Sequence, residues 1–76
     1  MSEARKFREA FARRVYERRW KLGLTQEQVA KKTRISRPSI ANIESARQLV
    51  PLNVLARLAK ALSCRMSYLL GETSRP

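Results

Sequence analysis

An arginine and a nearby asparagine, Arg37 and Asn42, carry side-chain chemistry that can distinguish the base pairs of DNA. A guanidinium group can donate two parallel hydrogen bonds to O6 and N7 of guanine, and a carboxamide can pair with N6 and N7 of adenine. The methyl group of Ala41 suits contact with a thymine methyl, and Pro38 could make the same contact or simply begin a helix. These side chains can read base edges only if one element presents them together.

A short helix from about Ser36 to Ser45 would present them. The Ser36 hydroxyl can accept from the free N–H groups at the helix start. At about 100° per residue the helix has an apolar side, formed by Ile40 and Ile43, which must be buried. The opposite side gathers the following residues: Arg37, Pro38, Ala41, Asn42 and Ser45.

Another short helix precedes this one. Gly23 interrupts a long first helical pattern, and Thr25 or Gln26 can then cap a helix over residues 26–32. Residues 33–35 are left for the turn. Two short helices joined by such a turn form the helix-turn-helix layout, whose second helix can lie in the DNA major groove.

The rest of the chain also has helical spacing, which predicts an all-α fold. A first helix is expected over residues 3–22, with an apolar stripe of Ala4, Phe7, Phe11, Val15 and Leu22. A fourth is expected over 52–62, with apolar positions Leu55, Leu58, Ala59 and Leu62. A short fifth helix over 66–70 should stop at Gly71. We expect residues 1–72 to form one domain and residues 73–76 a short frayed tail.

Composition favours an acidic partner. The 76 residues contain 17 Lys and Arg against 6 acids, a net charge of +11, so nucleic acid is the first candidate and an anionic membrane the second. No apolar run is long enough to span a bilayer, and no signal peptide is recognised. The single Cys suits a reducing cytosol. With no His and no catalytic or metal-binding constellation, we expect neither an enzyme nor a metal, cofactor or small-molecule site.

Several fragments resemble the Cro and phage-repressor family, often called Xre-like. They are Gly23-Leu24-Thr25-Gln26, Val29-Ala30, Ile35-Ser36-Arg37, Ser39-Ile40, Asn42-Ile43-Glu44, Leu58-Ala59, Ala61-Leu62 and Leu69-Leu70-Gly71. Their order and spacing cover roughly residues 11–72. The resemblance implies a compact five-helix lambda-repressor-like domain in which the second and third helices form the helix-turn-helix.

The resemblance also implies contacts to DNA phosphates. In this family the Gln that matches Gln26 binds a phosphate and often braces the residue that starts the recognition helix. Thr25 would be a second phosphate ligand as well as, or instead of, a plain N-cap. Arg47 lies where the family contacts the backbone, although a solvated loop cation is the alternative. The serines assigned to phosphate contacts are Ser36, Ser39 and Ser45.

Arg19 and Glu44 match a structural ion pair of the family. Removing one partner of such a pair should lower stability before it alters sequence preference. Other positions depart from the family pattern. Arg34 and Ala46 replace common glycines at helix ends, and Arg18 falls within the apolar stripe of the first helix, so it must extend outward, pair, or lie at the open end of the core.

The resemblance implies a cytoplasmic, bacterial or phage-encoded transcription regulator. We expect a homodimer on a near-palindromic operator, autoregulatory as in controller proteins or phage repressors. The dimer interface is expected at Met66, Tyr68 and Leu69, although these residues could instead close the monomer core. One alternative is an antitoxin-type protein-binding module that also represses its own operon. Another is nucleic-acid binding by charge alone.

Overall fold

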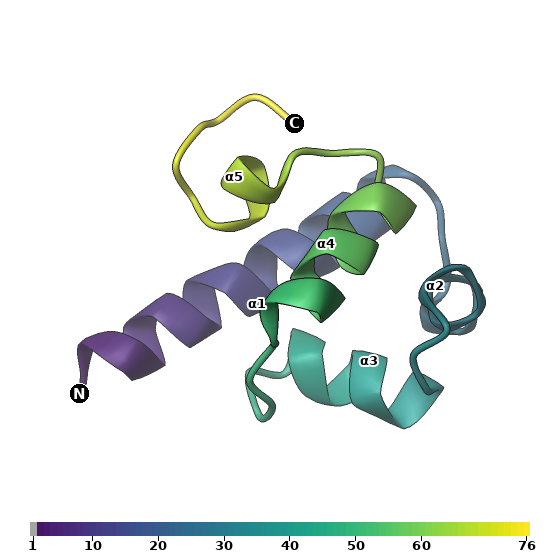
Figure 1. Cartoon of the computed structure of the whole chain (residues 1–76), viewed down its shortest axis with the longest axis horizontal. Coiled ribbons are helices and arrows are strands. Elements are labelled where there is room, and N and C mark those ends of the chain that lie inside the picture. The colour runs from purple at the N-terminus through teal and green to yellow at the C-terminus, as the bar shows by residue number, and fades with distance from the viewer. Residues whose placement is uncertain (1) are drawn as a thin grey trace.

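The computed structural model describes residues 2–76, and within this range it contains five helices and no strand (Figure 1). They are α1 (Glu3–Lys21), α2 (Gln26–Thr33), α3 (Arg37–Glu44), α4 (Leu52–Ala61) and α5 (Met66–Leu69). This confirms the expected all-α, five-helix architecture, and the helix ends that differ from the sequence-based prediction do so by one residue. No helix within the described range is long and apolar enough to cross a membrane.

Side-chain caps explain where the first three helices begin. Ser2 accepts a hydrogen bond from the N–H of Arg5 at the start of α1, and Ser36 accepts from the N–H of Ser39 at the start of α3. Thr25 accepts from the N–H of Gln28 at the start of α2. Each cap satisfies one of the N–H groups that a helix start leaves free.

Two non-glycine residues take the left-handed conformation at the ends of the helix-turn-helix. Arg34, at the end of α2, has φ 59°, and Ala46, just after α3, has φ 63°. The chain therefore keeps the turns that glycine usually makes, at the steric cost of a Cβ in that region. In particular, α3 ends before Ala46 and does not run on into the loop.

Side chains from all five helices form the core. Its fully buried large side chains include Val15, Val29, Ile40, Ile43, Leu58, Leu62 and Leu69. The predicted stripe of α1 was partly wrong, because only Phe11 and Val15 are buried, while Ala4, Phe7 and Leu22 are exposed. The first turns of α1 project beyond the other helices (Figure 1), and the apolar side chains of Ala4 and Phe7 there are exposed.

Arg18 joins α1 to the end of α4. Its Nε donates to the carbonyl of Leu62 at 2.9 Å, and its Nη2 donates to the carbonyl of Ser63 at 3.0 Å. Carbonyl groups at the end of a helix are otherwise without donors, and a cation there also suits the helix dipole. These hydrogen bonds hold Arg18 at the edge of the core.

After α5 the chain turns back, and the N–H of Arg65 donates to the carbonyl of Pro76.

Candidate nucleic-acid interface

One side of α3 faces outward with the residues proposed to read bases. Arg37, Pro38 and Asn42 are exposed, and Ala41 is half-buried. On the opposite side Ile40 is 0% and Ile43 is 1% exposed, so the core fixes the rotation of the helix. Among residues 2–76, neither the guanidinium of Arg37 nor the carboxamide of Asn42 forms an intramolecular hydrogen bond. Their donors and acceptors are therefore available to a ligand.

The three serines of this region lie along the same helix. The Ser36 hydroxyl donates to the hydroxyl of Ser39 at 3.0 Å, in addition to capping the helix. The Ser45 hydroxyl donates to the carbonyl of Asn42 at 3.2 Å. Ser36 and Ser45 are exposed, and Ser39 is half-buried. The hydroxyl of Ser39 can donate outward, because it is the acceptor in the pair with Ser36.

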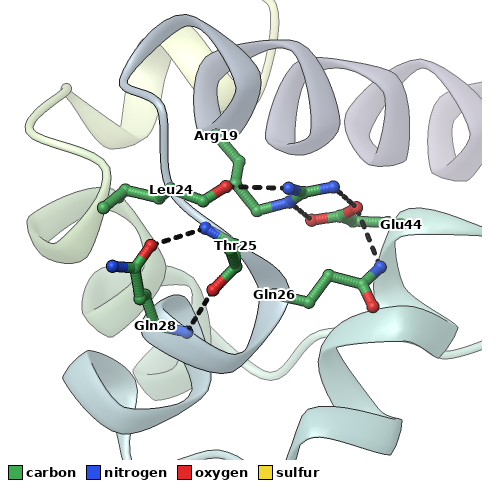
Figure 2. A network of polar contacts seen from close by, with 6 residues as sticks. All are labelled: Arg19, Leu24, Thr25, Gln26, Gln28 and Glu44. Atoms are coloured by element: carbon green, nitrogen blue, oxygen red, sulfur yellow. Dashed lines mark hydrogen bonds and ion pairs between the residues drawn. The ribbon is translucent and has the colours of Figure 1, made fainter.

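A reciprocal cap fixes the start of α2 (Figure 2). The N–H of Gln28 donates to Oγ1 of Thr25 at 3.0 Å, and the N–H of Thr25 donates to Oε1 of Gln28 at 2.8 Å. Gln28 was not among the predicted site residues, although a Thr followed three residues later by Gln is the sequence signature of this capping box. Thr25 remains exposed beside the start of the helix.

Gln26 connects α2 to α3. Its Nε2 donates to Oε1 of Glu44 at 3.2 Å, as Figure 2 shows. Glu44 is the last residue of α3, so the expected brace to the residue that starts this helix is not the contact the structure shows. The amide of Gln26 thus reaches a charged acceptor, which makes a stronger hydrogen bond than a neutral one.

Arg19 and Glu44 form a two-pronged ion pair beneath this surface (Figure 2). Nε of Arg19 lies 2.7 Å from Oε2 of Glu44, and Nη2 donates to Oε1 at 3.0 Å. The third nitrogen, Nη1, donates to the carbonyl of Leu24 at 2.8 Å. The side chains are only 10% and 4% exposed, and the guanidinium lies over the ring of Tyr16. A single side chain of α1 thus holds the α1–α2 turn and the end of α3.

The pair shifts the ionisation of the guanidinium. The hydrogen bond to Glu44 raises the pKa of Arg19 above its ordinary value, against the opposing effect of burial. A raised pKa in the folded state means that the stabilisation is complete below the ordinary guanidinium pKa and is lost as pH rises through the folded value. That window is strongly alkaline, so the guanidinium of Arg19 is charged at neutral pH.

A hollow of about 480 Å³ lies between the end of α1 and the two helices of the motif. Among its lining residues are Trp20, Thr25, Gln26 and Arg37. The structure therefore brings two of the predicted phosphate ligands and one predicted base reader to a single concave surface. Among the described residues, no group of three or more His, Cys, Asp or Glu is placed to hold a metal ion.

The other predicted residues lie away from this hollow. Arg47 is exposed in the loop after α3. Met66 and Tyr68 are half-buried on the surface of α5, whereas Leu69 is 0% exposed. Leu69 therefore belongs to the monomer core and has no free surface to offer a second copy, because its side of α5 packs against the cluster of buried residues.

Comparison with known proteins agrees with this geometry. The Helix-turn-helix family matches residues 15–69. The restriction–modification controller protein C.AhdI from Aeromonas hydrophila is 30% identical, with a TM-score of 0.78, and the match covers 80% of this chain and 92% of that one. The clp gene regulator ClgR from C. glutamicum is 27% identical, with a TM-score of 0.81, over 87% of this chain and 86% of that one. No curated protein sequence matches significantly.

The family match covers most of the chain, and the solved relatives share its fold over nearly their whole length. The two helices that carry the matched motif, α2 and α3, are the ones that present the open polar surface. The chain therefore belongs to the Xre-type helix-turn-helix family and is a DNA-binding transcription regulator of the controller type.

Proposed function

We propose that the protein binds a near-palindromic operator as a homodimer and regulates its own expression. The observation that carries this proposal is the outward side of α3, where Arg37 and Asn42 have no internal hydrogen-bond partners among residues 2–76. A helix held on its other side by buried Ile40 and Ile43 can present these groups to base edges in a fixed orientation. The net charge of +11 favours the same ligand.

Base reading is assigned to α3. Arg37 would donate to O6 and N7 of guanine, and Asn42 would pair with N6 and N7 of adenine. Ala41 and Pro38 would contact thymine methyl groups. Because Arg37 lies at the start of the helix and Asn42 lies nearer its end, they should read different base pairs of one half-site.

Positioning on the backbone is assigned to groups around α3. Thr25 and Gln26 at the start of α2, and Arg47 after α3, would contact phosphates. Gln26 retains one amide hydrogen after its bond to Glu44, and this hydrogen can reach a phosphate oxygen. The hydroxyls assigned to the same role are those of Ser36, Ser39 and Ser45. Such contacts set affinity and register rather than sequence preference.

A dimer is proposed because one recognition helix reads only a few base pairs. Two copies related by a twofold axis would place their α3 helices about 34 Å apart, one turn of DNA. Met66 and Tyr68 are the candidate contacts on α5, with Leu69 supporting them from the core. Autoregulation is supported by the likeness to a restriction–modification controller protein.

Selection of bound duplexes from a random pool, at about 150 mM salt with excess nonspecific DNA, tests the proposal. We expect a near-palindrome with guanine and adenine in each half, and a protein dimer on it by sedimentation. Binding to the natural promoter of the gene would then establish autoregulation. Enrichment of no motif, or a monomer at tens of micromolar with and without DNA, would contradict the proposal.

A further inference from the structure

Three arginines line a second hollow, which lies between the first turns of α1 and the end of α3. This hollow has a volume of about 450 Å³ and is lined by Arg5, Arg8, Glu9, Ser45, Ala46 and Arg47. Arg5 and Arg8 come from the first turns of α1, and Arg47 follows the end of α3. The surface thus joins two segments far apart in sequence.

The positive charge of this hollow is not neutralised within the protein. Among residues 2–76 the ion pairs are Arg13–Glu17 and Arg19–Glu44, so none of the three arginines lies within ion-pair distance of a carboxylate. Glu9 is the one acid of the lining, set against three guanidinium groups. Like charges gathered in this way repel each other, and an anion bound between them relieves that repulsion.

One atom of Arg8, the side-chain Nε, has no hydrogen-bond partner among residues 2–76. The side chain of Arg8 is half-buried, and this Nε is covered from solvent. A covered donor without an acceptor is uncommon in folded proteins and costs free energy until an acceptor arrives. Arg8 is therefore held partly desolvated at the edge of the hollow.

We propose that Arg5, Arg8 and Arg47 form one binding site for the DNA backbone, so that the first turns of α1 extend the contact made after α3. The ligand is a phosphodiester group, whose oxygens accept from guanidinium groups in a forked geometry. Arg5 and Arg8 lie outside residues 15–69, the part that matches the family, so the family match does not assign them a contact. The inference rests on the proposed DNA-binding function and adds a backbone segment to it.

The test compares two double variants that lose the same charge. Arg5→Gln/Arg8→Gln removes two guanidinium groups from the hollow. The control, Lys6→Gln/Lys60→Gln, removes two exposed cations that do not line it, one of them in the same turn of α1. Affinity for a duplex of about 30 base pairs is measured over 50–200 mM salt. Each lost phosphate contact should reduce the slope of log K against log salt by about 1.

Because the dimer carries two copies of each substitution, we expect the slope to fall by about 4 for the arginine pair and by much less for the lysine pair. Ethylation of individual phosphates should locate the effect. At one or two phosphates next to those contacted by Arg47, ethylation should weaken binding by the wild type and leave binding by the arginine double variant unchanged. The inference would be overturned if the arginine double variant kept the slope of the wild type, or if the slope fell equally in the arginine and lysine double variants. If Arg8→Gln impairs folding, the single variant at exposed Arg5 decides, with an expected fall of about 2 for the dimer.

Failure of the inference and failure of the proposed function give different results. If the wild type selects no sequence, the proposed function fails, whatever the slopes of the variants. If the wild type binds its operator and Arg47→Gln lowers the slope while the arginine pair leaves it unchanged, the proposed function stands. In that second case the hollow is not a backbone site.

Discussion

Two polar side chains near the end of α3, those of Glu44 and Asn42, are used in opposite ways. At Glu44 both carboxylate oxygens are hydrogen-bonded inside the protein, to Arg19 and Gln26. The carboxamide of nearby Asn42 points to solvent and has no partner among residues 2–76. Polar groups that are satisfied internally hold helices together, and those left unsatisfied at the surface are free to bind. Stability and sequence preference are therefore assigned to different residues of one helix.

The largest expected effect concerns the buried ion pair between Arg19 and Glu44. Glu44→Gln leaves the charge of Arg19 buried without its counter-ion, which should cost about 3–5 kcal/mol of unfolding free energy. The same change in the exposed Arg13–Glu17 pair is the control, with side chains 78% and 57% exposed. Glu17→Gln should cost no more than about 1 kcal/mol. Urea denaturation measures both, and similar losses would show that the buried pair has no special role.

Substitutions on the open side should change binding and leave stability nearly intact. Arg37→Ala and Asn42→Ala should each lose about 1–3 kcal/mol of discrimination at one base pair of the half-site. Their unfolding free energies should stay within about 0.5 kcal/mol of the wild type, because both side chains are exposed. Affinity for duplexes with single base changes measures the discrimination. Equal weakening on every duplex would mean that these residues contact phosphates instead.

Gln26 bonds to the buried carboxylate of Glu44 and is also proposed to contact a phosphate. Its replacement should therefore lower both the stability of the protein and its affinity for DNA. Gln26→Ala deletes the hydrogen bond to Glu44 at 3.2 Å and should cost about 1 kcal/mol of stability. It should also weaken binding by a similar factor on all duplexes, since a phosphate contact carries no sequence information. Melting and binding are measured on the same preparation. A change in base preference would place Gln26 among the base readers.

The smallest expected effect concerns the turn between the two helices. Arg34 has φ 59°, so Arg34→Gly removes a steric cost of about 1–2 kcal/mol and adds a chain-entropy cost of about 0.5–1 kcal/mol. We expect a net gain of up to about 1.5 kcal/mol with unchanged base preference. Arg34→Ala is the control, because it keeps the Cβ and should give no such gain. Thermal unfolding of the three proteins distinguishes these outcomes.

Much of the fold followed from local patterns. The spacing of Leu55, Leu58 and Leu62 predicted the buried side of α4, and Ser36 before Pro38 marked the start of α3. These features depend on neighbours within one or two turns, which a sequence displays directly. The open side of α3 could be predicted for the same reason, because Ile40 and Ile43 fix which side is buried.

Other features depend on how segments meet, and the sequence did not predict them. Phe7 continues the apolar stripe of α1, but it is 55% exposed because no helix covers the first turns. Gln26 bonds to the end of α3 rather than to its start, a choice made by the position of the Glu44 carboxylate. The gathering of Arg5 and Arg8 beside Arg47 likewise requires the crossing of α1 over the loop after α3.

The ion pair between Arg19 and Glu44 also has a consequence for how fast the protein unfolds. The two residues are 25 positions apart, so their contact closes a long loop and requires α1 and α3 to be docked already. A contact that forms after the main barrier to folding contributes little to the folding rate and mainly slows unfolding. If the pair forms after that barrier, its loss should speed unfolding more than it slows folding.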